Sequence, residues 1–122
     1  MALPHARPGH PIDLSPLGAT LPGAASHALL KTHALELIRL VLRAGQELPP
    51  HKVYGDATLH CLEGAVCVES AGGFAELRQS QLLLVPALAE YSMRALQDSS
   101  LLFTVQTPPG QPGSGSSTTG DA

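Results

Sequence analysis

The chain has 122 residues, a length that fits one compact hydrophobic core. Its formal net charge is -3, and its Lys and Arg residues are scattered, so it lacks the basic patch with which proteins bind nucleic acid or an anionic membrane. Aromatic residues make up only 3% of the chain and Trp is absent, which removes the stacking platforms of single-strand binders. We therefore expect neither a nucleic-acid nor a membrane partner.

Composition divides the chain into three regions. Residues 1–25 form an N-terminal arm rich in Pro, Gly and Ala, and residues 26–106 carry the periodic hydrophobic pattern of a folded domain. The low-complexity segment 107–122 is predicted to be disordered, because it cannot bury enough apolar surface to offset the entropy of ordering it. Pro and His near the N-terminus replace the apolar stretch of a signal peptide, and the apolar runs are too short to span a bilayer, so a cytoplasmic protein is expected.

The first periodic segment, residues 27–45, has features of both a helix and a strand. Its Ala, Leu and Glu residues favour a helix that would end at Gly45. The alternation of apolar and charged side chains within Leu35–Leu42 is equally consistent with a strand. The rest of the chain favours the strand, because many short strands there are separated by turn signals.

Turn signals at Glu63-Gly64, 70–73 and 97–100, together with Pro86, divide the second half of the domain into short segments. Strands are predicted at residues 58–62, 65–69, 74–77, 81–85, 91–96 and 101–106. Short strands at this spacing indicate an all-β, antiparallel sandwich or barrel.

Two cysteines, Cys61 and Cys67, stand at equal distances from Gly64. A hairpin with its turn at Gly64 would place them opposite each other, but bonds between directly opposed strand cysteines are usually strained, and a reducing cytosol disfavours them. We therefore expect two free, half-buried thiols that pack as small apolar groups.

The spacing of Gly45, His51 and Gly64 resembles the first motif of the cupin family, G-x5-H-x-H-x3-4-E-x6-G. The second cupin motif is G-x5-P-x-G-x2-H-x3-N, and only its proline, Pro86 here, matches by identity. The motif's other places are occupied by Ser80, Leu88, Tyr91 and Ala95. The resemblance covers residues 29–106 and implies a single-domain, cupin-type antiparallel jelly-roll barrel.

Cupins bind a divalent metal through two histidines, an acid and a later histidine, and the resemblance assigns these places to His51, Val53, Ala57 and Tyr91. Val and Ala have no lone pair to donate, and a tight site needs about three or four protein ligands. We therefore predict no cofactor. If a divalent ion (Fe, Mn, Zn, Ni or Cu) did bind, His51 would be its only ligand from the motif. His60 could be a second ligand only if a bulge turned it inward, because strand alternation places it on the outer face.

The resemblance implies an apolar pocket inside the barrel that suits a buried small molecule. Its expected lining is Val53, Ala57, Leu59, Cys61 and Leu84, with His51 and Tyr91 as polar contacts. No catalytic residues are predicted, since the sequence contains no nucleophile elbow, zinc-protease motif or phosphate-binding loop. The first hypothesis is a non-enzymatic small-molecule binding or regulatory module. The alternatives are a metal-dependent dioxygenase or isomerase that recruits His60, and a dimeric structural barrel without ligand.

Several polar residues are expected to have structural or surface roles. We expect the Tyr91 hydroxyl to be solvated or bonded to His51, and Arg39 and Arg43 to lie on a solvated strand face. Surface positions are expected for the remaining histidines, His5, His10, His27 and His33. Because exposed edge strands favour association, we also predict a homodimer to which the N-terminal segment contributes by strand addition or exchange.

Overall fold

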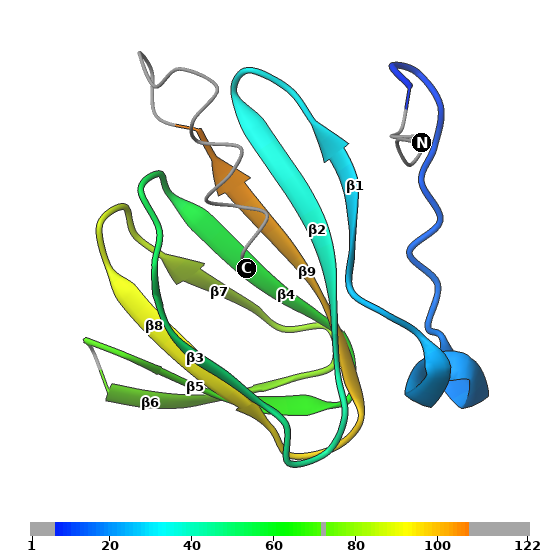
Figure 1. Ribbon diagram of the computed structural model, residues 1–122, viewed down its shortest axis with the longest axis vertical. Helices are drawn as coiled ribbons and strands as arrows, with labels where there is room; N and C mark the ends of the chain where they lie inside the picture. Colours follow the sequence, from blue (N-terminus) through cyan, green and yellow to red (C-terminus); the bar gives the residue numbers. More distant parts are fainter. Residues whose placement is uncertain (1–6, 72, 108–122) are drawn as a thin grey trace.

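The computed structural model describes residues 7–71 and 73–107. Within these ranges the chain forms one short 3-10 helix and a series of β-strands (Figure 1). The elements are η1 (Gly18–Gly23), β1 (His27–Lys31), β2 (Leu35–Leu42), β3 (Glu47–Lys52), β4 (Ala57–Glu63), β5 (Ala65–Ser70), β6 (Gly73–Arg78), β7 (Leu82–Val85), β8 (Glu90–Ala95) and β9 (Ser99–Gln106). The part of the chain that the structure describes contains no helix long and apolar enough to cross a membrane.

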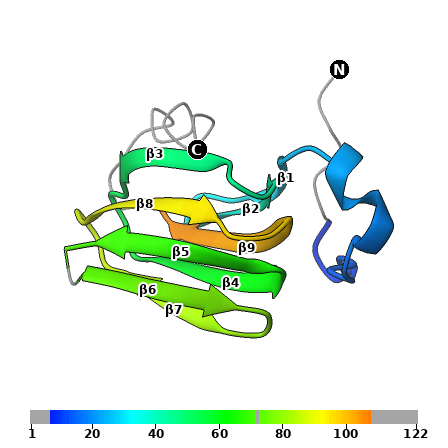
Figure 2. The ribbon, with the colours of Figure 1, turned by 90° about the horizontal axis from the view of Figure 1, so that it is seen from below.

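The strands form two antiparallel sheets that face each other (Figures 1 and 2). One sheet has the order β1-β2-β9-β4-β7 and the other the order β3-β8-β5-β6. Consecutive strands repeatedly pass from one sheet to the other, which is the connectivity of a jelly roll. The predicted all-β jelly-roll barrel is therefore confirmed.

Segment Leu35–Leu42 is a strand, not a helix, because every one of its residues pairs with a residue of β9 in the centre of the larger sheet. Tertiary pairing thus overrides the helical propensity of Ala, Leu and Glu. The later strands lie where they were predicted, with small shifts at their ends. Strands β1 and β3 were not predicted, and Ser99 and Ser100 belong to β9, not to the preceding turn.

Gly64 lies at a corner between the two sheets, so the hairpin considered for this position is wrong. β4 pairs with β7 and β9, whereas β5 pairs with β6 and β8. Gly64 has a φ of 88°, and a Cβ there would clash with the backbone of Asp98 and Ser99. Cys61 and Cys67 consequently lie in different sheets and both are free, as expected; Cys61 is buried and Cys67 half-buried.

Residues 15–18 of the N-terminal arm are held against the outside of the larger sheet by a partly buried polar cluster. Arg39 donates to the carbonyl oxygen of Ser15 at 2.8 Å and to the hydroxyl of Ser100 at 3.1 Å, and its guanidinium lies 3.4 Å from the Glu63 carboxylate. Glu63 accepts the backbone N–H of Leu17 at 2.8 Å. Arg39 is only 4% exposed, so its predicted place on a solvated face is wrong. The arm covers this face, and sequence periodicity alone does not show that.

Glu63 shows how this cluster favours the ionised carboxylate. Burial alone would raise the pKa of Glu63, but hydrogen bonds from the Leu17 N–H, the Ser100 hydroxyl and the Gly18 N–H, together with the charge of Arg39, outweigh burial and lower it. The docked arm is therefore linked to the ionisation of one carboxyl group.

The other surface expectations have different outcomes. His10, His27 and His33 are exposed, as predicted, and Arg43 is exposed while it donates to the carbonyl oxygen of Pro22 at 2.9 Å. His5 and the segment predicted to be disordered, apart from its first residue, lie outside the described residues.

Candidate functional site

One end of the barrel gathers the starts of β2, β4 and β8 and the ends of β3 and β9, and it is the upper end in Figure 1. Backbone hydrogen bonds join residues 53–56 to residues 88–89 and to Gln106, and Thr107 to Ala34. We call this region the upper end of the barrel. The cupin motif places its metal-ligand positions here.

His51 and Tyr91 face each other at the upper end, because they are directly paired across β3 and β8. Their ring centroids are 5.9 Å apart and the rings are nearly perpendicular, at 84°. The pairing follows a register shift between Leu48 and His51, where Pro49 and Pro50 interrupt the ladder. A strand with a bulge thus turns the half-buried His51 ring towards the buried ring of Tyr91.

The Tyr91 side chain is 1% exposed, and its hydroxyl has no hydrogen-bond partner among the described residues. The expectation that this hydroxyl is solvated or bonded to His51 is therefore wrong. Burial raises the pKa of the Tyr91 phenol, so it stays protonated at neutral pH. A neutral, unpartnered hydroxyl inside an apolar barrel can both donate to and accept from a bound molecule.

Most of the residues expected to line the pocket do lie in the barrel interior. Val53, Ala57, Leu59 and Cys61 are at most 3% exposed and belong to one packed core. Leu84 does not, because it is 63% exposed on the outer face of β7. The register explains this correction: the neighbours of Leu84 in the strand, Leu83 and Val85, pair with the inward-facing Leu59 and Ala57. Those two residues, not Leu84, face the core.

The donor set does not fit a cupin metal centre. Of the four ligand positions, Val53 and Ala57 carry no donor atom, which leaves the His51 imidazole and the Tyr91 phenol. His60 cannot complete the site with His51, because it lies on the outer face between the buried Leu59 and Cys61. The residues that the structure describes include no group of three or more His, Cys, Asp or Glu side chains that could hold a metal ion.

The backbone conformation at the motif positions matches the cupin motifs more closely than the residue identities do. Gly45 and Gly64 both have positive φ angles, of 84° and 88°. At the two glycine positions of the second motif, Ser80 and Leu88 also have positive φ angles, of 72° and 69°. Non-glycine residues rarely adopt this left-handed conformation. The match to the second motif, weak by identity, is therefore supported by backbone geometry.

Glu36 is a polar residue of the barrel interior that the sequence interpretation overlooked. It is 5% exposed, and its Oε1 atom has no hydrogen-bond partner among the described residues. It lies in β2 on the same face as the buried Ile38 and Leu40, and it pairs with Val105 of β9. The alternation that identified the strand would have placed it inside.

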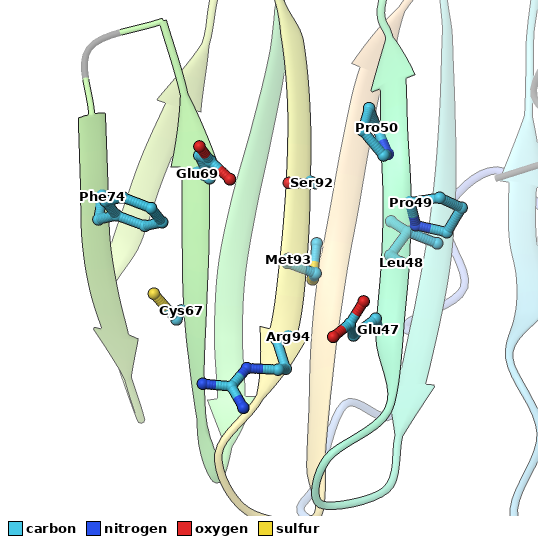
Figure 3. A pocket seen from close by; sticks show the side chains of 10 residues that line it. All are labelled: Glu47, Leu48, Pro49, Pro50, Cys67, Glu69, Phe74, Ser92, Met93 and Arg94. Carbon is cyan, nitrogen blue, oxygen red and sulfur yellow. The ribbon is translucent and has the colours of Figure 1, made fainter.

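A separate shallow groove of about 350 Å³ lies on the outside of the smaller sheet (Figure 3). Its polar and aromatic lining comprises Glu47, Cys67, Glu69, Phe74, Ser92 and Arg94. Figure 3 shows these side chains on strands β3, β8, β5 and β6. The groove is open and carries charges of both signs, whereas the barrel interior holds unpartnered polar atoms in an apolar setting. The buried polar atoms of the interior, Tyr91 Oη and Glu36 Oε1, have no partner among the described residues, and a bound molecule could satisfy them.

Comparison with known proteins agrees on the fold. No protein-family model and no curated protein sequence matches the chain. Solved structures that match include an RmlC-like cupin from Desulfovibrio desulfuricans (21% identity, TM-score 0.66, 80% of this chain and 97% of that one) and a cupin superfamily protein from Desulfitobacterium hafniense DCB-2 (17%, 0.65, 68% and 76%). A salicylate 1,2-dioxygenase from Pseudaminobacter salicylatoxidans matches at 23% identity and TM-score 0.62, over 69% of this chain and 26% of its own.

These similarities define the class of the fold. The chain is a small cupin-type jelly-roll barrel, as its motif spacing predicted. Proteins with this fold include an enzyme, the salicylate 1,2-dioxygenase, and proteins described only as cupins.

Proposed function

We propose that this protein binds a small organic molecule in its barrel without a metal ion, as a non-enzymatic binding or regulatory module. The observation that carries the proposal is the buried Tyr91 hydroxyl, which has no partner among the described residues. Leaving such a group unpaired costs about 1–3 kcal/mol, and a bound ligand would remove that cost. The apolar side chains around it suit the body of a small molecule.

His51 supplies the second polar contact of the proposed site. Its imidazole packs nearly perpendicular to the Tyr91 ring and is half-buried, so part of it is exposed. A neutral imidazole offers one donor and one acceptor. Together with the phenol it can orient one end of a ligand, while Val53 and Ala57 contact its apolar part.

A thermal-shift screen of small organic acids, sugars and amines tests this proposal, because a ligand that binds the native state raises its melting temperature. Hits should lose their effect in Tyr91→Phe, which removes only the hydroxyl, and in His51→Ala. The matched control is Tyr54→Phe, since Tyr54 is 51% exposed. A barrel that responds to no compound in a broad screen would contradict the proposal.

The enzyme alternative required His60 as a second metal ligand beside His51, and the outward position of His60 removes that basis. The scaffold alternative remains a proposal of its own, supported by exposed apolar side chains on the outside of the larger sheet. Leu82 and Leu84 of the edge strand β7 are 64% and 63% exposed. A homodimer would cover such a surface. Light scattering should then give the mass of a dimer, and Leu84→Glu should shift it to that of a monomer.

A further inference from the structure

Glu36 is the buried acidic residue of the barrel interior whose chemistry the fold does not use. It is 5% exposed, and no residue in the described part of the chain bonds to its Oε1 atom. On the inner face of the larger sheet it pairs with Val105, which in turn pairs with Ala57, an expected pocket residue. Glu36 is therefore part of the same interior surface as the proposed ligand site.

Strand geometry also brings Glu36 to the same end of the barrel as the two polar residues of the site. Glu36 lies at the start of β2 and Tyr91 at the start of β8, and both strands start at the upper end (Figure 1). His51 lies near the end of β3, which also reaches the upper end. β2 and β3 belong to the two sheets that face each other (Figure 2).

The immediate neighbours of Glu36 do not neutralise it. Lys31 is opposite Glu36 in the β1–β2 register, but its side chain is exposed, and no ion pair links the two within residues 7–71 and 73–107. Arg39 lies on the other face of β2 and bonds to Ser15 and Ser100. The Oε1 atom of Glu36 is thus a buried acceptor without a partner among the described residues, and a donor group of a ligand would satisfy it.

From this arrangement we infer that the ligand of the barrel carries a protonated amine, which Glu36 binds. An ammonium group forms charge-assisted hydrogen bonds with a carboxylate and balances its charge, whereas a neutral hydroxyl would leave the charge uncompensated. An anionic ligand would be repelled. Tyr91 adds a hydroxyl that can accept from the amine and a ring that favours a nearby cation. The inference rests on the proposed function and names the ligand class for that site.

The test compares probes of the same shape with different head groups. The probes are butylamine, butanol and butyrate, each tested by thermal shift and calorimetry at neutral pH. Only butylamine should bind and raise the melting temperature. Glu36→Gln keeps the shape of the side chain and should weaken butylamine binding by about tenfold or more, since hydrogen bonds to charged groups are worth about 1.5–3 kcal/mol. The control Glu47→Gln, at an exposed position on the outside of the smaller sheet, should bind as the wild type does.

A second variant separates a binding role from a structural one. Glu36→Leu removes the buried Oε1 atom that has no partner among the described residues, so the free variant should melt at or above the wild-type temperature while it no longer responds to butylamine. A large loss of stability in Glu36→Leu, or unchanged butylamine binding in Glu36→Gln, would overturn the inference. If butanol or butyrate binds and butylamine does not, the amine assignment fails and the proposed function stands. If neither these probes nor the wider screen gives a ligand, both fail.

Discussion

Leu88 offers a direct test of the link between backbone conformation and the cupin motif. Its φ of 69° places it in the left-handed region, which costs a non-glycine residue about 1–2 kcal/mol. Leu88 is 66% exposed, so its side chain contributes little burial. Replacement by Gly removes the strain but adds about 0.4–1 kcal/mol of unfolded-state entropy. The net expectation for Leu88→Gly is a stabilisation of about 0.5–1 kcal/mol.

Urea unfolding followed by circular dichroism measures this difference as a shift of the midpoint at constant slope. The matched control is Leu84→Gly, since Leu84 is similarly exposed, at 63%, but lies in an extended strand. There the same substitution should destabilise by about 0.5–1 kcal/mol. If both variants lost stability by the same amount, the argument from the positive φ would be refuted.

Three further predictions concern Glu63, the two thiols and the corner glycine. The pKa of Glu63 in the folded state lies below its ordinary 4.5. Its contribution to the free energy of unfolding is therefore present above pH 4.5 and is lost as the pH falls through the lower folded-state pKa. Thermal unfolding in acid should show this loss as a falling melting temperature. In Glu63→Gln, which has no ionisable carboxyl at this position, the melting temperature should fall less over the same pH range. In native protein a thiol reagent should modify the half-buried Cys67 first. Cys61 is buried, and burial raises the pKa of its thiol, so it should react only on unfolding. Equal reaction rates of the two thiols in native protein would contradict the fold. Gly64→Ala should lower the free energy of unfolding by more than about 2 kcal/mol, because it adds a backbone clash to the strain of a positive φ. A near-neutral effect in urea unfolding would exclude the corner geometry.

Sequence patterns predicted the parts of this fold that local alternation determines. In Leu35–Leu42 the alternation gave the correct strand and, applied to Glu36, would also have placed that residue inside. In the run of residues 82–85 every side chain is apolar, so the pattern could not show which leucine faces inward, and Leu84 was assigned to the wrong side. Face assignments are thus reliable only where polar residues interrupt the apolar ones.

Features that depend on distant parts of the chain were not accessible from the sequence. Arg39 has the alternation of a solvated residue, but the N-terminal arm covers it through contacts such as the one with Ser15. β3 contains Pro49 and Pro50, which usually exclude a strand, and it forms because they fall within a register shift beside β8. The positions of Gly45 and Gly64, by contrast, could be read from spacing, and both glycines have positive φ angles, of 84° and 88°.

The central claim is that the cupin shell persists here while its interior binds an organic molecule instead of a metal ion. Metal analysis by mass spectrometry of tag-free protein, with His51→Ala alongside, tests it most directly. Wild type and variant should both contain far less than stoichiometric metal, because Val53 and Ala57 cannot coordinate an ion. Stoichiometric metal in the wild type that is lost in His51→Ala would contradict the claim.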